Sequence, residues 1–304
     1  MRSMMWLWLA IATVLVPAPA MAAPDYQPGE VFEIRRESRM ESATNDGSSG
    51  SSFDRDTLAV RVLGRTDAGV ELEYDLPPDT SNEDRARQWK FPVHVRRRTD
   101  EPTQLLNRAE LETRIAAWLK AGDLPREACG RWYFTWNAFR VECDPDSVIE
   151  TLEAFDPRPD GVAAGVLVGD PAANGPAALT LKSKTGTSAT LVADLIVDPE
   201  AIQNTRAEAD VIVGEIMRKP VSLEAALKAR SADAISGTIT ITFETDAAGR
   251  VLRRIKVMTI ATIGPAQTGP GTRTETQTTT EVLDWRRLPR PQRGQTSVMV
   301  APLK

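Results

Sequence analysis

Residues 238–243 read Thr-Ile-Thr-Ile-Thr-Phe, a strict alternation of polar and apolar side chains. This period of two predicts a β-strand with one face buried and the other in water. The sequence Asp246-Ala247-Ala248-Gly249 then predicts a turn, after which residues 251–263 return as a second strand. This antiparallel hairpin is the clearest structural unit of the chain and indicates its class of fold.

The same organisation is predicted near the start of the chain. Residues 30–76 contain alternating strands separated by a Gly/Ser/Asn loop at residues 44–52. A second turn, Asp67-Ala68-Gly69, precedes residues 70–76, where apolar side chains alternate with acids. Phe91, Val93 and Val95 indicate a further strand.

Helices are predicted by their capping residues and their apolar spacing. Asn107 is expected to cap a helix over residues 107–121, which places Leu111, Ile115, Trp118 and Leu119 on one stripe. Asp198-Pro199-Glu200 predicts the start of a helix that runs to about residue 218. Shorter helices are expected over residues 81–89 and 222–230, each after a serine.

These elements together predict an α+β fold. Long antiparallel β-hairpins are expected to form one or two twisted sheets, with several helices packed on one face. In outline this arrangement resembles the half-open barrels that carry lipids or lipoproteins between bacterial membranes, a likeness of fold that no motif extends to function. The predicted organisation is a signal peptide (1–22), an N-terminal domain (23–155), a linker or long loop (156–177), a C-terminal domain (178–288) and a flexible tail (289–304).

Two segments of the chain have an unusual composition. Residues 156–177 contain eight Gly or Pro residues, which is typical of a linker or of a long loop within one domain. Residues 272–280 contain six threonines, so both faces of that strand are polar. Such a strand is expected at the edge of a sheet, where polar side chains discourage unwanted pairing, or else facing a wet cavity.

The first 22 residues are typical of a secretory signal peptide. Arg2 precedes an apolar run from Met4 to Val16, and Ala20 and Ala22 match an A-x-A cleavage pattern. We therefore expect export to a bacterial periplasm, with cleavage near Ala22 and no membrane span afterwards. Arg2 is the only charged residue removed, so the formal net charge of −5 becomes −6. A soluble acidic chain is a poor partner for nucleic acid.

In an oxidising compartment the two cysteines, Cys129 and Cys143, are expected to form a disulfide. They are 14 positions apart, so a symmetric hairpin centred on Trp136 places them opposite one another and Tyr133 opposite Phe139. Between them lies the densest aromatic cluster of the chain. Its members are Trp132, Tyr133, Phe134, Trp136 and Phe139. They are predicted either to contact a ligand or partner, or to pack on neighbouring helices.

No catalytic motif is complete. His94 is the single histidine and lies in a predicted strand, and no G-x-S-x-G motif accompanies it. Lys184-Thr185-Gly186 matches one element of penicillin-recognising enzymes, but no serine has lysine three positions later, so we interpret it as a turn. We expect no catalytic residues, no metal and no cofactor.

Three functions remain as hypotheses. The first is a non-catalytic periplasmic protein that binds an apolar, lipid-like or protein ligand, a carrier being the form that needs an enclosed apolar cavity. The second is a hydrolase with a carboxylate-only site, which needs converging acids with raised pKa values. The third is an envelope interaction protein, which needs an exposed apolar patch that includes Trp136. The sequence leaves the ligand, the partner and the oligomeric state open.

Overall fold

A computed structural model describes residues 27–98, 101–134, 138–155, 161–266 and 269–284. Its main element is one antiparallel sheet of ten strands in the order β10-β11-β12-β13-β14-β1-β2-β3-β4-β5. The strands of this sheet are β1 (Val31–Thr44), β2 (Ser49–Thr66), β3 (Gly69–Asp75), β4 (Val93–Arg97), β5 (Gln104–Leu105), β10 (Thr180–Lys184), β11 (Ser188–Ile196), β12 (Ala234–Asp246), β13 (Val251–Ala266) and β14 (Gly269–Asp284).

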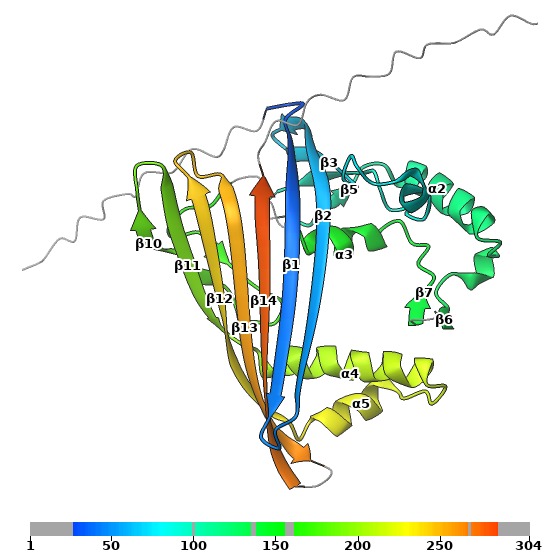
Figure 1. Cartoon of the computed structure of the whole chain (residues 1–304), viewed down its shortest axis with the longest axis vertical. Coiled ribbons are helices and arrows are strands. Elements are labelled where there is room, and N and C mark those ends of the chain that lie inside the picture. Colours follow the sequence, from blue (N-terminus) through cyan, green and yellow to red (C-terminus); the bar gives the residue numbers. More distant parts are fainter. Residues whose placement is uncertain (1–26, 99–100, 135–137, 156–160, 267–268, 285–304) are drawn as a thin grey trace, which may run out of the picture.

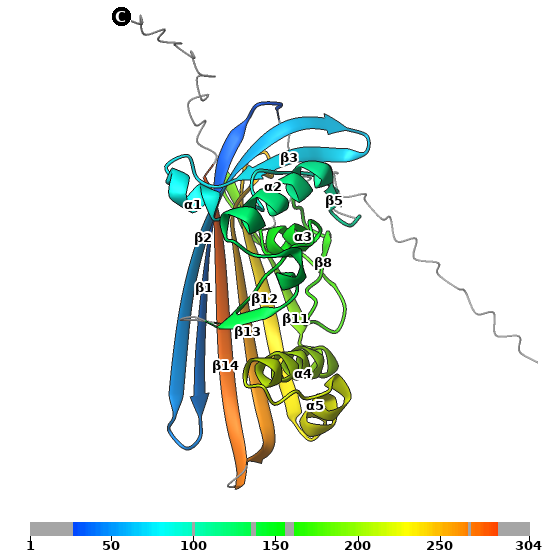
Figure 2. The same ribbon diagram turned by 90° about the vertical axis from the view of Figure 1, so that its right-hand side faces the viewer.

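Within the described residues the α-helices are α1 (Asn82–Ala86), α2 (Arg108–Ala121), α3 (Ser147–Glu153), α4 (Pro199–Ile216) and α5 (Leu223–Arg230). Helices α2 to α5 lie on one face of this sheet, as Figures 1 and 2 show. The predicted α+β class with long twisted hairpins is confirmed. Within the described residues β10 and β5 do not pair with each other, so the sheet is open and not a closed barrel.

The hairpin β12–β13 forms as the alternation predicts. Ile239, Ile241 and Phe243 are buried toward the helices, whereas the threonines between them face the opposite side of the sheet. The turn is held by Asp246, whose Oδ1 accepts hydrogen bonds from the N–H groups of Ala248 and Arg250, each at 2.9 Å. The buried half of the strand therefore provides one wall of the core.

The loop predicted at residues 44–52 is shorter than expected. β1 continues to Thr44 and β2 resumes at Ser49, so only residues 45–48 form the turn. Cross-strand backbone pairing extends through the polar residues that looked like a loop, because their backbone groups are satisfied whatever side chains they carry. Gly47 adopts φ +87°, a conformation that glycine reaches without steric cost.

Asp46 in this turn gives a pH-sensitive marker of the β1–β2 hairpin. Hydrogen bonds from Ser48 and Thr44 lower the pKa of Asp46 from 3.8 to about 2. A lowered pKa means that the folded turn favours the ionised form, so its contribution is present above pH 3.8 and is lost as the pH falls toward 2. We expect an NMR titration to give a midpoint near 2 for Asp46. A midpoint near 3.8 would show that the turn is not formed in solution.

The helices match their predicted caps with one change. Asp198 accepts from Glu200 N–H at 2.9 Å and Ser222 accepts from Ala225 N–H at 3.2 Å. Asn107 precedes α2 but makes no cap bond; its Oδ1 accepts from the N–H of His94 at 2.9 Å instead. The first turn of α2 is thereby tied to β4. The stripe of α2 is confirmed, with Leu111, Ile115 and Leu119 buried and Trp118 partly buried.

The polar strand predicted over residues 272–280 is not an edge strand, and that expectation was wrong. β14 lies in the middle of the sheet between β13 and β1. Its polar side chains are satisfied across neighbouring strands and by a helix: Arg206 of α4 donates to Glu275 at 2.7 Å, and Gln277 donates to Ser38 at 3.5 Å. A strand can therefore be polar on both faces at the centre of a sheet when its neighbours supply partners.

Pairing of β14 with β1 joins the two halves of the chain in one sheet. A row of alternating charges crosses this junction on the face that carries the helices, and we call it the charge row. It consists of Asp56 on β2, Arg36 on β1, Glu281 on β14 and Arg254 on β13, which occupy directly opposed register positions. The division into two domains stays a prediction, and the sheet itself is continuous.

Part of the Gly/Pro-rich segment lies within the described residues and packs against the core. Val162 and Val168 are buried, and β8 (Leu167–Val168) pairs with β9 (Ala177–Ala178). Asp170 binds Lys256 of β13 at 2.8 Å. The predicted signal peptide, residues 156–160 and the predicted tail lie outside the described residues.

Candidate functional site

The disulfide hairpin forms in the predicted register. Cys129 and Cys143 are bonded, with their Cα atoms 5.5 Å apart. Beyond them, β6 (Trp132–Phe134) and β7 (Ala138–Arg140) pair so that Tyr133 lies opposite Phe139. The two rings are stacked, with centroids 6.0 Å apart. The predicted disulfide is confirmed.

The aromatic side chains of this hairpin divide between core and surface. Tyr133 packs against the core cluster and Trp132 is half-buried, whereas Phe139 is 44% exposed. The backbone of Phe134 pairs with Ala138, and Trp136 lies outside the described residues. The ligand-binding role of these five residues stays a prediction.

Removal of the disulfide is expected to destabilise the protein. Replacing both cysteines with serine should lower the free energy of unfolding by about 3 kcal/mol, because the cross-link restricts the unfolded chain. Urea unfolding of the oxidised protein and of the double variant measures this difference. Equal unfolding midpoints would mean that the cross-link does not constrain the unfolded ensemble.

A group of exposed apolar residues lies next to this hairpin, and the sequence analysis did not identify it. β6 contacts α4, and Figure 1 places the hairpin beside the end of α4 that points away from the sheet. At the end of α4 and directly after it, Ile212, Val213 and Met217 are 40%, 55% and 62% exposed. We call Ile212, Val213 and Met217 the apolar patch.

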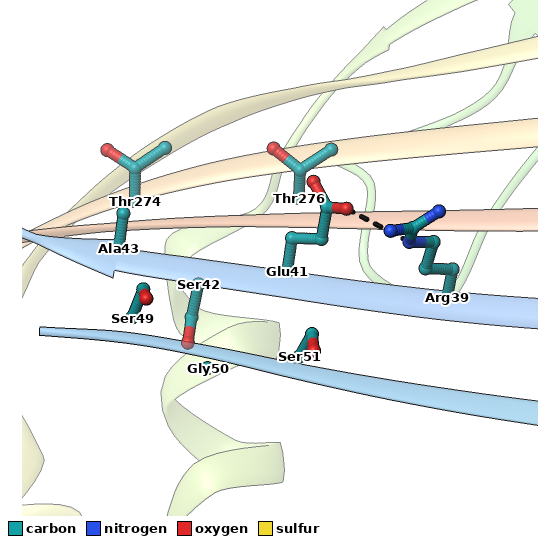
Figure 3. A pocket seen from close by; sticks show the side chains of 9 residues that line it. All are labelled: Arg39, Glu41, Ser42, Ala43, Ser49, Gly50, Ser51, Thr274 and Thr276. Atoms are coloured by element: carbon teal, nitrogen blue, oxygen red, sulfur yellow. Dashed lines mark ion pairs between the residues drawn. The ribbon is translucent and has the colours of Figure 1, made fainter.

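A concave site lies on the opposite face of the sheet, near the end of the β1–β2 hairpin. It is an open groove of about 530 Å³. Figure 3 shows its lining side chains, which are Arg39, Glu41, Ser42, Ala43, Ser49, Gly50, Ser51, Thr274 and Thr276. Arg39 and Glu41 form an ion pair of 2.9 Å in which both side chains are more than half exposed. Hydroxyls and charges line this groove, so it differs from the apolar cavity that a lipid carrier needs.

The candidate catalytic groups have structural partners. His94 of β4 contacts Glu73 of β3, with Nε2 and Oε2 2.9 Å apart, and Glu73 also faces Arg61 at 3.6 Å. These three residues form one cross-strand polar ladder on the uncovered face of the sheet. Thr185 and Ser188 hydrogen-bond within the turn between β10 and β11, so the Lys-Thr-Gly sequence lies at a turn, as predicted.

One pair of carboxylates meets part of the requirement for an acid–base site. Burial, followed by the nearby charge of Asp54, raises the pKa of Asp56, while Arg36 opposes this shift. The two acids lie two positions apart on β2, so they project from the same side of one strand. A carboxylate hydrolase needs acids on both sides of the bond to be cleaved, which this placement does not provide.

The described parts of the chain contain no cluster of three or more His, Cys, Asp or Glu side chains placed to hold a metal ion. Within those same ranges, no helix is both long and apolar enough to cross a membrane.

Comparison with known proteins does not identify a family. No family model and no curated protein matches the chain. One solved structure that was found is a conserved protein of unknown function with a hot dog fold from Alicyclobacillus acidocaldarius. It is 11% identical, with 83% of this chain and 79% of that chain covered, at a TM-score of 0.09. Similarity at that level carries no argument about fold or function.

Proposed function

We propose that this chain is a non-catalytic binding protein of the bacterial periplasm whose ligand is another protein, bound at the apolar patch. The observation that carries the proposal is the exposure of Ile212, Val213 and Met217 beside the disulfide hairpin. Grouped apolar side chains in contact with water are costly unless a partner covers them, and such patches are typical of interaction sites. The half-buried Trp132 and the exposed Phe139 add aromatic area of the kind that anchors interfaces.

The shape of the patch favours a protein over a lipid. A lipid carrier encloses its ligand in an apolar cavity, whereas these side chains lie exposed at the end of a helix. Polar residues border them, because Glu208 and Glu215 of the same helix are exposed. An apolar centre with a charged rim is the usual composition of a protein interface.

Site-specific cross-linking in cells tests this proposal. A photoreactive amino acid at position 213 should give one discrete cross-linked species, and the same group at position 204 should not. The control is matched because both positions are exposed on α4, and nine residues of helix turn them to opposite sides. The variant Val213→Lys should weaken capture from position 212 at least tenfold, while its thermal unfolding stays unchanged.

Three results would contradict parts of the proposal. Equal cross-linking at positions 204 and 213 would show that contact is not specific to the patch. A lipid mass retained in native mass spectrometry would make the ligand a lipid. An intact mass that still includes residues 1–22, in protein from the periplasmic fraction, would contradict export with cleavage near Ala22.

A further inference from the structure

The first ten residues of β2, Ser49–Leu58, form an open strand edge. β3 pairs with β2 only from Ala59 onward, so within the described residues Ser49–Leu58 have a strand neighbour on the β1 side alone. Figure 2 shows the β1–β2 hairpin along one margin of the sheet, away from the helices. No proline or lysine interrupts residues 49–57, and these are two of the usual devices that protect an edge from pairing.

The hydrogen-bonding groups that face outward can be identified from the register. Val62 exchanges two hydrogen bonds with the β1 side, to Gly29 and Glu30, and Thr44 bonds to Ser48. Antiparallel pairing alternates, so the even-numbered residues of β2 bond to β1. The backbone N–H and C=O groups of the odd-numbered residues 49–57 therefore point to the open edge.

We propose that this edge pairs with the same edge of a second copy of the chain, antiparallel and centred on Phe53, to form a symmetric dimer. Phe53 is 61% exposed, with the guanidinium of Arg55 5.6 Å from its ring centroid. In this register each Phe53 lies opposite the other, which forms an aromatic cross-strand pair. A two-fold axis through this residue is the geometry expected of an isologous interface.

Charge selects this register over its neighbours. Centred on Phe53, the edge places Arg55 opposite Ser51, Asp54 opposite Ser52 and Asp56 opposite Gly50. Every charge thus meets a small neutral residue.

A shift of the centre to either neighbouring charged residue creates repulsion. Centring on Asp54 places that acid opposite its own copy. Centring on Arg55 opposes two arginines and sets Asp54 against Asp56. Like charges directly opposite one another destabilise a strand pair.

A register shifted toward the turn gives weaker strand pairing for another reason. Centring on Ser52 sets Asp56 and Thr57 beyond the end of the partner strand at Ser49, so fewer backbone hydrogen bonds form. Only the register centred on Phe53 uses all of residues 49–57 without opposing like charges. Because one strand edge buries little surface, we expect a dimer that dissociates at low concentration.

Cysteine cross-linking gives the sharpest test, because the two native cysteines are already bonded to each other. Phe53→Cys should form a cross-linked dimer with a short bis-maleimide. Ser51→Cys alone should not, since Arg55 is its opposite residue. A mixture of Ser51→Cys and Arg55→Cys should again give a dimer. Cross-linking of Ser51→Cys alone that equals that of Phe53→Cys would overturn the register.

Sedimentation of the unmodified chain keeps the proposal testable apart from these variants. We expect mass to rise from monomer to dimer with concentration, and Phe53→Asp to shift the midpoint at least tenfold higher. Amide exchange at residues 51, 53 and 55 should slow as the dimer forms. A monomer at every concentration would overturn the proposal. If residues 51, 53 and 55 of such a monomer were protected from amide exchange, another segment of the same chain would cover the edge, and this result would also overturn the proposal.

Discussion

Replacing Arg97 with alanine is expected to lower the free energy of unfolding by about 3–5 kcal/mol, because a hydrogen bond to a charged group contributes about 1.5–3 kcal/mol. The guanidinium is only 7% exposed and donates to two carbonyls at the end of α3, Leu152 O at 2.8 Å and Phe155 O at 2.9 Å. It also lies 5.7 Å from the ring centroid of Tyr74. Arg97 therefore fixes α3 to the sheet.

The chain provides a matched control in the preceding residue. Arg96 points to the other face of β4, where it pairs with Glu71 at 2.7 Å and is 29% exposed. Arg96→Ala should cost less than about 1 kcal/mol, as most accessible ion pairs do. Arg97→Lys should recover only part of the loss, since one ammonium does not reproduce the planar donor geometry. Urea unfolding of the three variants gives the comparison, and equal losses for Arg96→Ala and Arg97→Ala would contradict this role.

Local patterns predicted the individual elements well. The alternation at residues 238–243 and the capping residues Asp198 and Ser222 depend on neighbours in sequence, so they can be interpreted without knowledge of the fold. The spacing of residues in β4 also indicates that Arg97 is buried. It follows Val93 and Val95 at a spacing of two, which places it on their buried face. Residues 96–98 are all arginine, so the residue types there do not show the alternation of buried and exposed positions.

Strand order could not be predicted in the same way. Pairing of β14 with β1 joins residues more than two hundred positions apart, such as Glu281 and Arg36, and no local property of either strand specifies it. The threonines near the end of the chain therefore suggested an edge. The apolar patch was missed for a related reason, since Val213 and Met217 have the spacing of core residues and only the tertiary fold exposes them.

The largest electrostatic contribution to stability is expected from the charge row. Glu281 is fully buried and binds Arg254 through both carboxylate oxygens, at 3.0 Å each. Arg36 occupies the opposed position on β1, and Arg254 is 16% exposed. Glu281→Gln should lower the free energy of unfolding by about 3–5 kcal/mol, because it removes the carboxylate that pairs with the largely buried guanidinium of Arg254. Urea unfolding at neutral pH measures this loss.

A double-mutant cycle separates the pair from a simple loss of packing. If the charge is the cause, adding Arg254→Gln to Glu281→Gln should cost much less than Arg254→Gln alone, so the two changes should be coupled by more than about 1 kcal/mol. The neighbouring pair Glu244 and Arg253 is the control, because it joins β12 to β13 at 3.6 Å with both side chains over 40% exposed. Its coupling should be below about 0.5 kcal/mol. Equal coupling in the two cycles would mean that the sheet tolerates a charge at its centre as readily as at its surface, and that this ion pair adds nothing particular to the pairing of β14 with β13.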